Sequence, residues 1–245
     1  MKIEGKVCLV TGGARGIGRK IVETYAAAEA KAVYALDMGF DGFDEVTDKY
    51  ANVKSAQLNV TDAAAVKEII EKIWTDEGRI DVLVNNAGIT RDGLIQNMSD
   101  EDWNAVISVN LTGVFNMGRE VGPKMMGQGS GSIINMASIV ALTGNVGQSN
   151  YAATKGGVVS MTKTWAKEFA RKGAKVRANA IAPGFIRTPM TEKVPQKILD
   201  SMVSKTLLAR MGEAEDIANA ALWLASDYSS FVTAQTISVD GGLVI

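Results

Sequence analysis

The chain has 245 residues with 26 basic and 27 acidic side chains, and this balanced charge gives no electrostatic footprint for nucleic acid. It has no histidine and a single cysteine, Cys8, which excludes Ser-His-Asp catalysis, histidine-based zinc sites and an intramolecular disulfide. Hydrophobic residues make up 47% of the sequence, enough for the core of one large α/β domain spanning residues 1–245. We expect no metal site, and because histidine is absent, any proton transfer must fall to Tyr, Lys, Asp or Glu.

No segment has the pattern of a signal peptide or a membrane span. The first residues run directly into a strand-like stretch. The longest charge-free run, residues 125–154, is interrupted by Gly, Ser, Asn and Gln. We expect a soluble cytoplasmic protein.

Strand-like and helix-like stretches alternate along the chain. We expect strands at residues 6–10, 32–37, 55–59, 81–85, 132–136, 176–182 and 235–239. Helices are expected at residues 17–30, 63–77, 100–126, 150–172 and 213–225, with Ser99 as the N-cap of the third. Seven strands alternating with helices predict a single-domain, doubly wound parallel sheet of the Rossmann type, flanked by helices.

Residues 184–211 form the irregular part of this pattern. They contain Pro189, Pro195 and three methionines, Met190, Met202 and Met211. Two interpretations stay open: a mobile lid over a hydrophobic pocket, or ordinary packing of surface helices.

A glycine-rich loop, Thr11-Gly-Gly-Ala-Arg-Gly-Ile-Gly18, joins the first strand to the first helix. Gly12, Gly16 and Gly18 allow a tight turn and a close approach to a pyrophosphate, while the helix N-terminus supplies N–H donors. Because the loop follows the first strand of an alternating pattern, it predicts a dinucleotide site.

The end of the second strand bears on the choice of cofactor. Asp37 stands where an acidic side chain accepts from both ribose hydroxyls of NAD and repels a 2′-phosphate. Arg15 favours NADPH instead, because a guanidinium in the glycine loop can bind that phosphate. Alternatively, Arg15 forms a salt bridge or is a solvated charge of the loop. We favour NADH over NADPH.

Tyr151 and Lys155 share one face of a predicted helix, with Ser138 upstream. An ammonium ~4 Å from the phenol would favour its ionised form by about 4 kcal/mol at an effective dielectric constant of 20. We therefore expect Lys155 to lower the pKa of Tyr151, which suits acid–base work on a carbonyl or alcohol. Taken alone, the spacing is more typical of a helix with one buried aromatic and one solvated lysine.

Other motifs in the sequence favour the catalytic interpretation of Tyr151 and Lys155. Over its whole length the sequence resembles the short-chain dehydrogenase/reductase family, and the matching motifs are Thr11–Gly18, Asn85–Gly88, Asn110, Ser138, Tyr151, Lys155 and Pro183–Gly184. The resemblance implies that Tyr151 is the acid/base and that Ser138 hydrogen-bonds the substrate oxygen. It also implies that Lys155 holds the nicotinamide ribose and that Asn110 positions a water in a proton relay.

The same resemblance implies the remaining site residues. Asn59 and Val60 form the adenine edge, and Thr188 binds the carboxamide with backbone contacts from Ile186. Expected cofactor contacts are Gly12, Arg15, Gly16, Ile17, Gly18, Asp37, Asn59, Val60, Asn86, Ala87, Gly88, Tyr151, Lys155, Pro183, Gly184, Ile186 and Thr188. Expected substrate contacts are Ser138, Gln148 and Tyr151.

Within the family, four stretches are similar to bacterial 3-oxoacyl-[acyl-carrier-protein] reductases: residues 86–92, 109–115, 144–151 and 182–186. This implies NAD(P)H-dependent reduction of a 3-oxoacyl thioester, carried by acyl carrier protein or CoA, to the (3R)-3-hydroxyacyl thioester of fatty-acid synthesis. It also implies a homotetramer. Acetoacetyl-CoA reductases share much of the pattern, and an alcohol, polyol or sugar dehydrogenase is the next alternative. A non-catalytic nucleotide-binding regulator would not need Asn110, Ser138, Tyr151 and Lys155 together.

Two features depart from this subgroup. The subgroup commonly uses NADPH, whereas Asp37 favours NADH. It commonly has basic residues both before the fifth strand and after the Tyr/Lys helix, where a carrier protein docks. Arg171 and Lys172 keep the second set, but residues 126–131 carry no base, which leaves acyl-CoA esters open.

Overall fold

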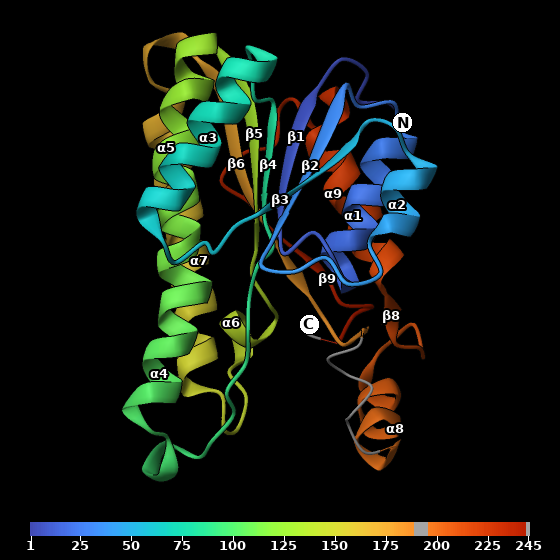
Figure 1. The fold of residues 1–245 in the computed structure, drawn as a ribbon. Helices are drawn as coiled ribbons and strands as arrows, with labels where there is room; N and C mark the ends of the chain where they lie inside the picture. The colour runs from blue at the N-terminus through green and yellow to red at the C-terminus, as the bar shows by residue number, and fades with distance from the viewer. Residues whose placement is uncertain (189–195, 244–245) are drawn as a thin grey trace.

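A computed structural model describes residues 1–188 and 196–243. Its main feature is a seven-stranded sheet in the order β3-β2-β1-β4-β5-β6-β9, with every neighbouring pair parallel (Figure 1). The strands are β1 (Val7–Thr11), β2 (Ala32–Asp37), β3 (Val53–Gln57), β4 (Val82–Asn85), β5 (Ser130–Met136), β6 (Lys175–Pro183) and β9 (Thr236–Val239). The predicted doubly wound α/β fold is confirmed.

Helices cover both faces of this sheet (Figure 1). One layer holds α1 (Gly16–Ala27), α2 (Asp44–Lys49) and α9 (Ala214–Ala225); the other holds α3 (Ala63–Glu77), α4 (Asp100–Ile107), α5 (Gly113–Gln128) and α7 (Ser149–Phe169). The strands β1, β2 and β4 carry near-continuous apolar runs because each side of the sheet packs on its own hydrophobic cluster.

Short elements gather beyond the carboxyl edge of the sheet, where parallel α/β proteins bind ligands. They are α6 (Val140–Thr143), α8 (Gln196–Lys205) and a separate strand pair, β7 (Ile186–Arg187) with β8 (Gly212–Glu213). Three further elements are the single-turn helices η1 (Ile95–Asn97), η3 (Arg171–Gly173) and η4 (Asp227–Ser229).

Several predicted boundaries were wrong. The helix expected over 100–126 is divided by a π-helical segment, η2 (Ser108–Thr112), although Ser99 caps its start as predicted. The helix expected to reach residue 172 ends at Phe169 and is followed by the single turn η3, in which Lys172 and Gly173 adopt positive φ angles of 58° and 81°. The third strand begins and ends two residues earlier than expected. The helix α2 was not predicted.

The irregular segment 184–211 contains the helix α8. Pro189, Met190 and Pro195 lie outside the described residues, as do Val244 and Ile245. The choice between a lid and packed surface helices therefore stays a prediction. None of the helices within residues 1–188 and 196–243 is long and apolar enough to cross a membrane.

Candidate active site

The glycine-rich loop forms a tight turn at the carboxyl end of β1. Gly12 and Gly16 have positive φ angles of 63° and 54°, a conformation that glycine adopts without strain. A Cβ atom at Gly18 would run into the carbonyl oxygen of Gly12, so only glycine lets α1 start this close to the loop. Arg15 is the N-cap residue of α1, and its side chain is exposed. That side chain accepts no hydrogen bond from the first backbone N–H groups of the helix. Ile17 anchors the helix start on the apolar cluster.

The loop after β4 locks onto this turn. Asn86 Nδ2 donates to the carbonyls of Thr11 and Gly12 at 3.0 and 3.1 Å. Thr11 Oγ1 accepts from the backbone N–H of Ala87 at 3.1 Å. A Cβ on Gly12 would lie 3.0 Å from the Ala87 Cα. The predicted Asn86-Ala87-Gly88 floor therefore lies against the predicted glycine loop.

Asp37 ends β2 beside the same loop. One carboxylate oxygen accepts from the N–H of Ala14 at 3.1 Å and the other from the N–H of Met38 at 2.8 Å. The side chain is partly exposed. An acidic group is thus held at the mouth of the glycine turn.

The two residues predicted for the adenine edge differ in exposure. Val60 is buried and its side chain packs where a Cβ on Gly113 would lie. Asn59 is exposed, and its Oδ1 accepts from the N–H and hydroxyl of Thr61. Their contact with a cofactor stays a prediction.

The second part of the site surrounds Gly88. A Cβ on Gly88 would lie 3.4 Å from Asn110 Oδ1 and 3.7 Å from Lys155 Nζ. Asn110 is fully buried within η2 and clasps the backbone of Ile89, accepting from its N–H at 2.8 Å and donating to its carbonyl at 2.9 Å. π-Helical turns of this kind are frequent at functional sites.

Lys155 is a buried cation. Its side chain is 4% exposed, and Nζ donates to the Met136 carbonyl, at the end of β5, at 2.7 Å. Burial lowers the pKa of Lys155 to about 8.

Ser138 and Tyr151 complete the cluster. Ser138 follows β5, is buried, and accepts from the N–H of Val140 at 3.1 Å. Its hydroxyl lies near the Tyr151 phenol and lowers the pKa of that group. Asn110, Ser138, Tyr151 and Lys155 thus meet at the carboxyl ends of β4 and β5.

The expected lowering of the Tyr151 pKa is wrong. Burial is the largest influence and raises the pKa of Tyr151; the neighbouring Ser138 hydroxyl lowers it less, and the negative charge of Asp92 raises it further. Lys155 Nζ lies 5.5 Å from the centroid of the tyrosine ring and directs its hydrogen bond to Met136. The phenol therefore keeps its proton at neutral pH, which suits a proton donor.

Gln148 lies just before α7, and its amide binds a residue that the sequence did not single out. Its Nε2 donates to both carboxylate oxygens of Asp92 at 3.1 Å. Asn150 was also missed: its Oδ1 accepts from the N–H of Tyr151 at 2.7 Å, and its Nδ2 donates to the Arg91 carbonyl at 2.9 Å. Asp92 and Asn150 lie within segments 86–92 and 144–151, which are similar to the subgroup as whole segments. That similarity assigned no role to either residue.

The segment after β6 supplies the last predicted contacts. Gly184 donates from its N–H to the Val239 carbonyl at 3.0 Å, and a Cβ there would lie 2.6 Å from the Asp240 Cα. Pro183 ends β6, Ile186 is buried in β7, and Thr188 is partly buried at the last described position before the gap. The structure sets these residues beyond the carboxyl end of β6, and their cofactor contacts stay predictions.

Comparison with known proteins gives the class. The family model described as "Enoyl-(Acyl carrier protein) reductase" matches residues 12–244. The chain belongs to the short-chain dehydrogenase/reductase family, and it is an NAD(P)-dependent oxidoreductase.

Curated relatives share one name, 3-oxoacyl-[acyl-carrier-protein] reductase FabG. The chain is 52% identical to the protein of Thermotoga maritima over 249 residues, covering 100% of both chains. It is 43% identical to the Escherichia coli K12 protein over 244 residues, covering 99% of each. A Staphylococcus aureus relative is 43% identical over 246 residues, covering 97% of this chain and 98% of its own. The predicted resemblance is confirmed.

Proposed function

We propose that this protein reduces the 3-oxo group of acyl thioesters to the (3R)-3-hydroxy product, with NADH preferred over NADPH. The observation that carries the proposal is the Tyr151 phenol, which keeps its proton at neutral pH and lies beside Ser138 and Lys155 at the carboxyl edge of the sheet, near the glycine loop. The names of the relatives supply the substrate class.

The residues at the glycine loop fit a dinucleotide. A tight turn with no room for a Cβ at Gly18 and a helix start without a side-chain cap suit a pyrophosphate. Asp37 beside Ala14 suits two free ribose hydroxyls and disfavours a 2′-phosphate, which is why we propose NADH. When bound, the reduced nicotinamide supplies hydride to the substrate.

The protein's own part in the reaction concerns the carbonyl oxygen. As the 3-oxo carbon accepts hydride and its C=O π bond breaks, negative charge develops on that oxygen. Ser138 and Tyr151 donate hydrogen bonds to it. Tyr151 then transfers its hydroxyl proton to the oxygen, which completes the alcohol, and regains a proton from solvent. Lys155, anchored on Met136, lies beside the phenol and limits the cost of its transient negative charge.

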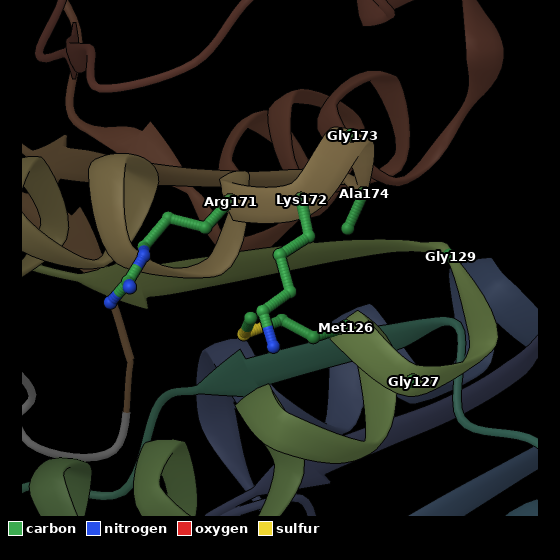
Figure 2. Close-up of a pocket in the computed structure, with 7 residues that line it drawn as sticks. All are labelled: Met126, Gly127, Gly129, Arg171, Lys172, Gly173 and Ala174. Atoms are coloured by element: carbon green, nitrogen blue, oxygen red, sulfur yellow. The ribbon is translucent and has the colours of Figure 1, made fainter.

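One cavity bears on the acyl carrier. Met126, Gly127 and Gly129 line a cavity of about 290 Å³ together with Arg171, Lys172, Gly173 and Ala174. These residues come from the two segments in which the subgroup commonly carries basic residues, before β5 and after α7. In this chain only the segment after α7 supplies basic residues to the cavity. Figure 2 shows Lys172 extending towards Met126 and Arg171 pointing away. We propose that CoA esters and carrier-protein esters are both accepted, since a reduced basic patch weakens the preference for an acidic carrier.

The assembly and location follow from the same resemblance. We propose that the protein works as a homotetramer in the cytoplasm. Size-exclusion chromatography with light scattering tests the tetramer.

The decisive assay follows cofactor oxidation at 340 nm. NADH and NADPH are each paired with acetoacetyl-CoA and acetoacetyl-carrier protein, and crotonyl-CoA serves as an enoyl control. We expect turnover with both 3-oxo thioesters, a higher kcat/KM with NADH, and none with crotonyl-CoA. No turnover on the 3-oxo thioesters, together with NAD⁺ reduction by an alcohol, polyol or sugar, would replace the proposal with the dehydrogenase alternative.

A further inference from the structure

The helix α7 is attached to β5 at two points. Near its start, Lys155 Nζ donates to the carbonyl of Met136. Two turns further along the same helix face, Thr162 Oγ1 accepts from Asn135 Nδ2 at 2.9 Å. Asn135 and Met136 are adjacent residues of β5. One short piece of strand therefore fixes both the catalytic end of α7 and its middle.

The second attachment continues into β4. Asn85 is the direct partner of Asn135 in the β4–β5 register, and its Nδ2 donates to Asn135 Oδ1 at 2.8 Å. Asn85, Asn135 and Thr162 are all at most 2% exposed. Leu83 and Ile133, one position back on the same sheet face, belong to the apolar cluster under α7. Two amides and a hydroxyl thus occupy places where aliphatic side chains would pack.

The hydrogen bonds of this chain run in one direction. Asn85 donates to Asn135, Asn135 donates to Thr162, and the Thr162 hydroxyl donates to the Val158 carbonyl at 2.8 Å. Turning one amide over would oppose two acceptors or two donors, and turning both over would divert the Thr162 hydroxyl from Val158 to Asn135. Only the observed arrangement makes all three bonds, and it leaves the buried Asn85 Oδ1 without a hydrogen-bond partner among the described residues. A slip of α7 by one residue would move Thr162 by about 1.5 Å and break the chain.

We propose that Thr162, held through Asn135 and Asn85, is a positioning residue that sets the axial placement of α7 on the sheet and hence of Tyr151 and Lys155. Thr162 acts through the helix. Apolar contacts of α7, such as Trp165 against Gly118, hold the helix against its neighbour, and the bond from Asn135 to Thr162 adds a directional contact to the strand. The kinetic part of this inference rests on the proposed function.

The test begins with Thr162→Val, which keeps the volume and removes the hydroxyl. Small misplacements of reacting groups cost up to about 100-fold in rate, so we expect kcat with acetoacetyl-CoA to fall about 10- to 100-fold while KM changes little. Thr162→Ser should restore kcat. The matched control is Thr164→Val on the exposed side of α7, where the hydroxyl makes the same bond to the carbonyl four residues back, Ser160, at 3.2 Å; it should keep the wild-type kcat.

A second readout needs no substrate. Acetic anhydride labelling followed by peptide mass spectrometry reports how accessible Lys155 is. We expect faster labelling of Lys155 in Thr162→Val, and wild-type rates in Thr162→Ser and Thr164→Val. If Thr162→Val does not fold, Thr162→Ala, which introduces no new contact, should give the same two results.

The outcomes separate this inference from the proposed function. A variant that loses melting temperature but keeps wild-type kcat and wild-type Lys155 labelling would show a purely structural chain and overturn the inference. A wild-type protein inactive on every thioester, whose Lys155 labelling still responds to Thr162, would overturn the proposed function and support the inference.

Discussion

The loop after β1 and the cluster after β5 build neighbouring parts of one site by different means. The cofactor end consists of backbone: positive φ angles at Gly12 and Gly16, and a Gly18 that admits no Cβ. The proton-transfer end consists of side chains buried at the ends of strands and held by backbone carbonyls and N–H groups. The cofactor end is therefore sensitive to added side-chain volume, whereas the proton-transfer end is sensitive to the charge and protonation of its side chains.

This contrast implies that a substitution at one end can impair turnover or cofactor binding without impairing the other. Tyr151→Phe removes only the hydroxyl group, and with it the proton donor, so we expect kcat to fall by about 10² to 10⁴ while NADH affinity stays at the wild-type value. Steady-state kinetics and NADH fluorescence titration on the same sample check both halves. Near wild-type turnover would contradict the assignment of Tyr151 as proton donor.

The buried charge of Lys155 gives the proton-transfer end a pH signature. A lysine pKa lowered from 10.5 to about 8 penalises the folded state fully below pH 8, and the penalty disappears as pH rises towards 10.5, because only the unfolded state then binds the proton. Relative to Lys155→Met, the wild type should therefore gain about 2–3 kcal/mol of unfolding free energy between pH 7 and pH 10. Urea unfolding at both pH values measures the difference. A pH-independent difference would mean that Lys155 has its ordinary pKa.

The cofactor end should respond to volume alone. Gly18→Ala places a methyl group against the Gly12 carbonyl, and overpacking of this kind costs about 1–3 kcal/mol. The Kd for NADH should therefore rise about 10- to 100-fold. Gly127→Ala in α5, where an added Cβ meets nothing within 4 Å, is the control and should bind NADH normally. Equal affinities for NADH in the two variants would argue against a close-fitting loop.

The smallest expected effect concerns cofactor choice. Asp37→Ser removes the charge beside the glycine loop but keeps a hydrogen-bonding group. We expect the ratio of kcat/KM for NADH over NADPH to fall about tenfold, as hydrogen bonds to charged groups contribute about 1.5–3 kcal/mol. An unchanged ratio would shift the discrimination to other residues, with Arg15 the first to test.

The same contrast explains what the sequence could predict. Glycines in the sequence indicate a backbone conformation or a close approach that other residues do not allow, so the loop and its place after the first strand were predicted correctly. Tyr151 and Lys155, with Ser138 upstream, were singled out by their spacing, and Asn110 came from the family resemblance; the structure brings these four side chains together.

The sign of the Tyr151 pKa shift was missed because spacing along a helix does not report burial. The clasp of Asn110 on Ile89 and the bond from Lys155 to Met136 use backbone groups, which residue types do not reveal. The π-helical turn at Asn110 interrupts a pattern whose hydrophobic spacing continues through it. Asn135 and Thr162 lie in a predicted strand and a predicted helix without a pattern that singles them out, and only the three-dimensional register joins them.

The most direct test of the central claim is the product formed from acetoacetyl-CoA and NADH. Mass spectrometry and chiral chromatography should find (3R)-3-hydroxybutyryl-CoA, equimolar with the NADH oxidised and absent with Tyr151→Phe. Oxidation of NADH without a 3-hydroxy product, or the same yield from the Tyr151→Phe variant, would contradict the account.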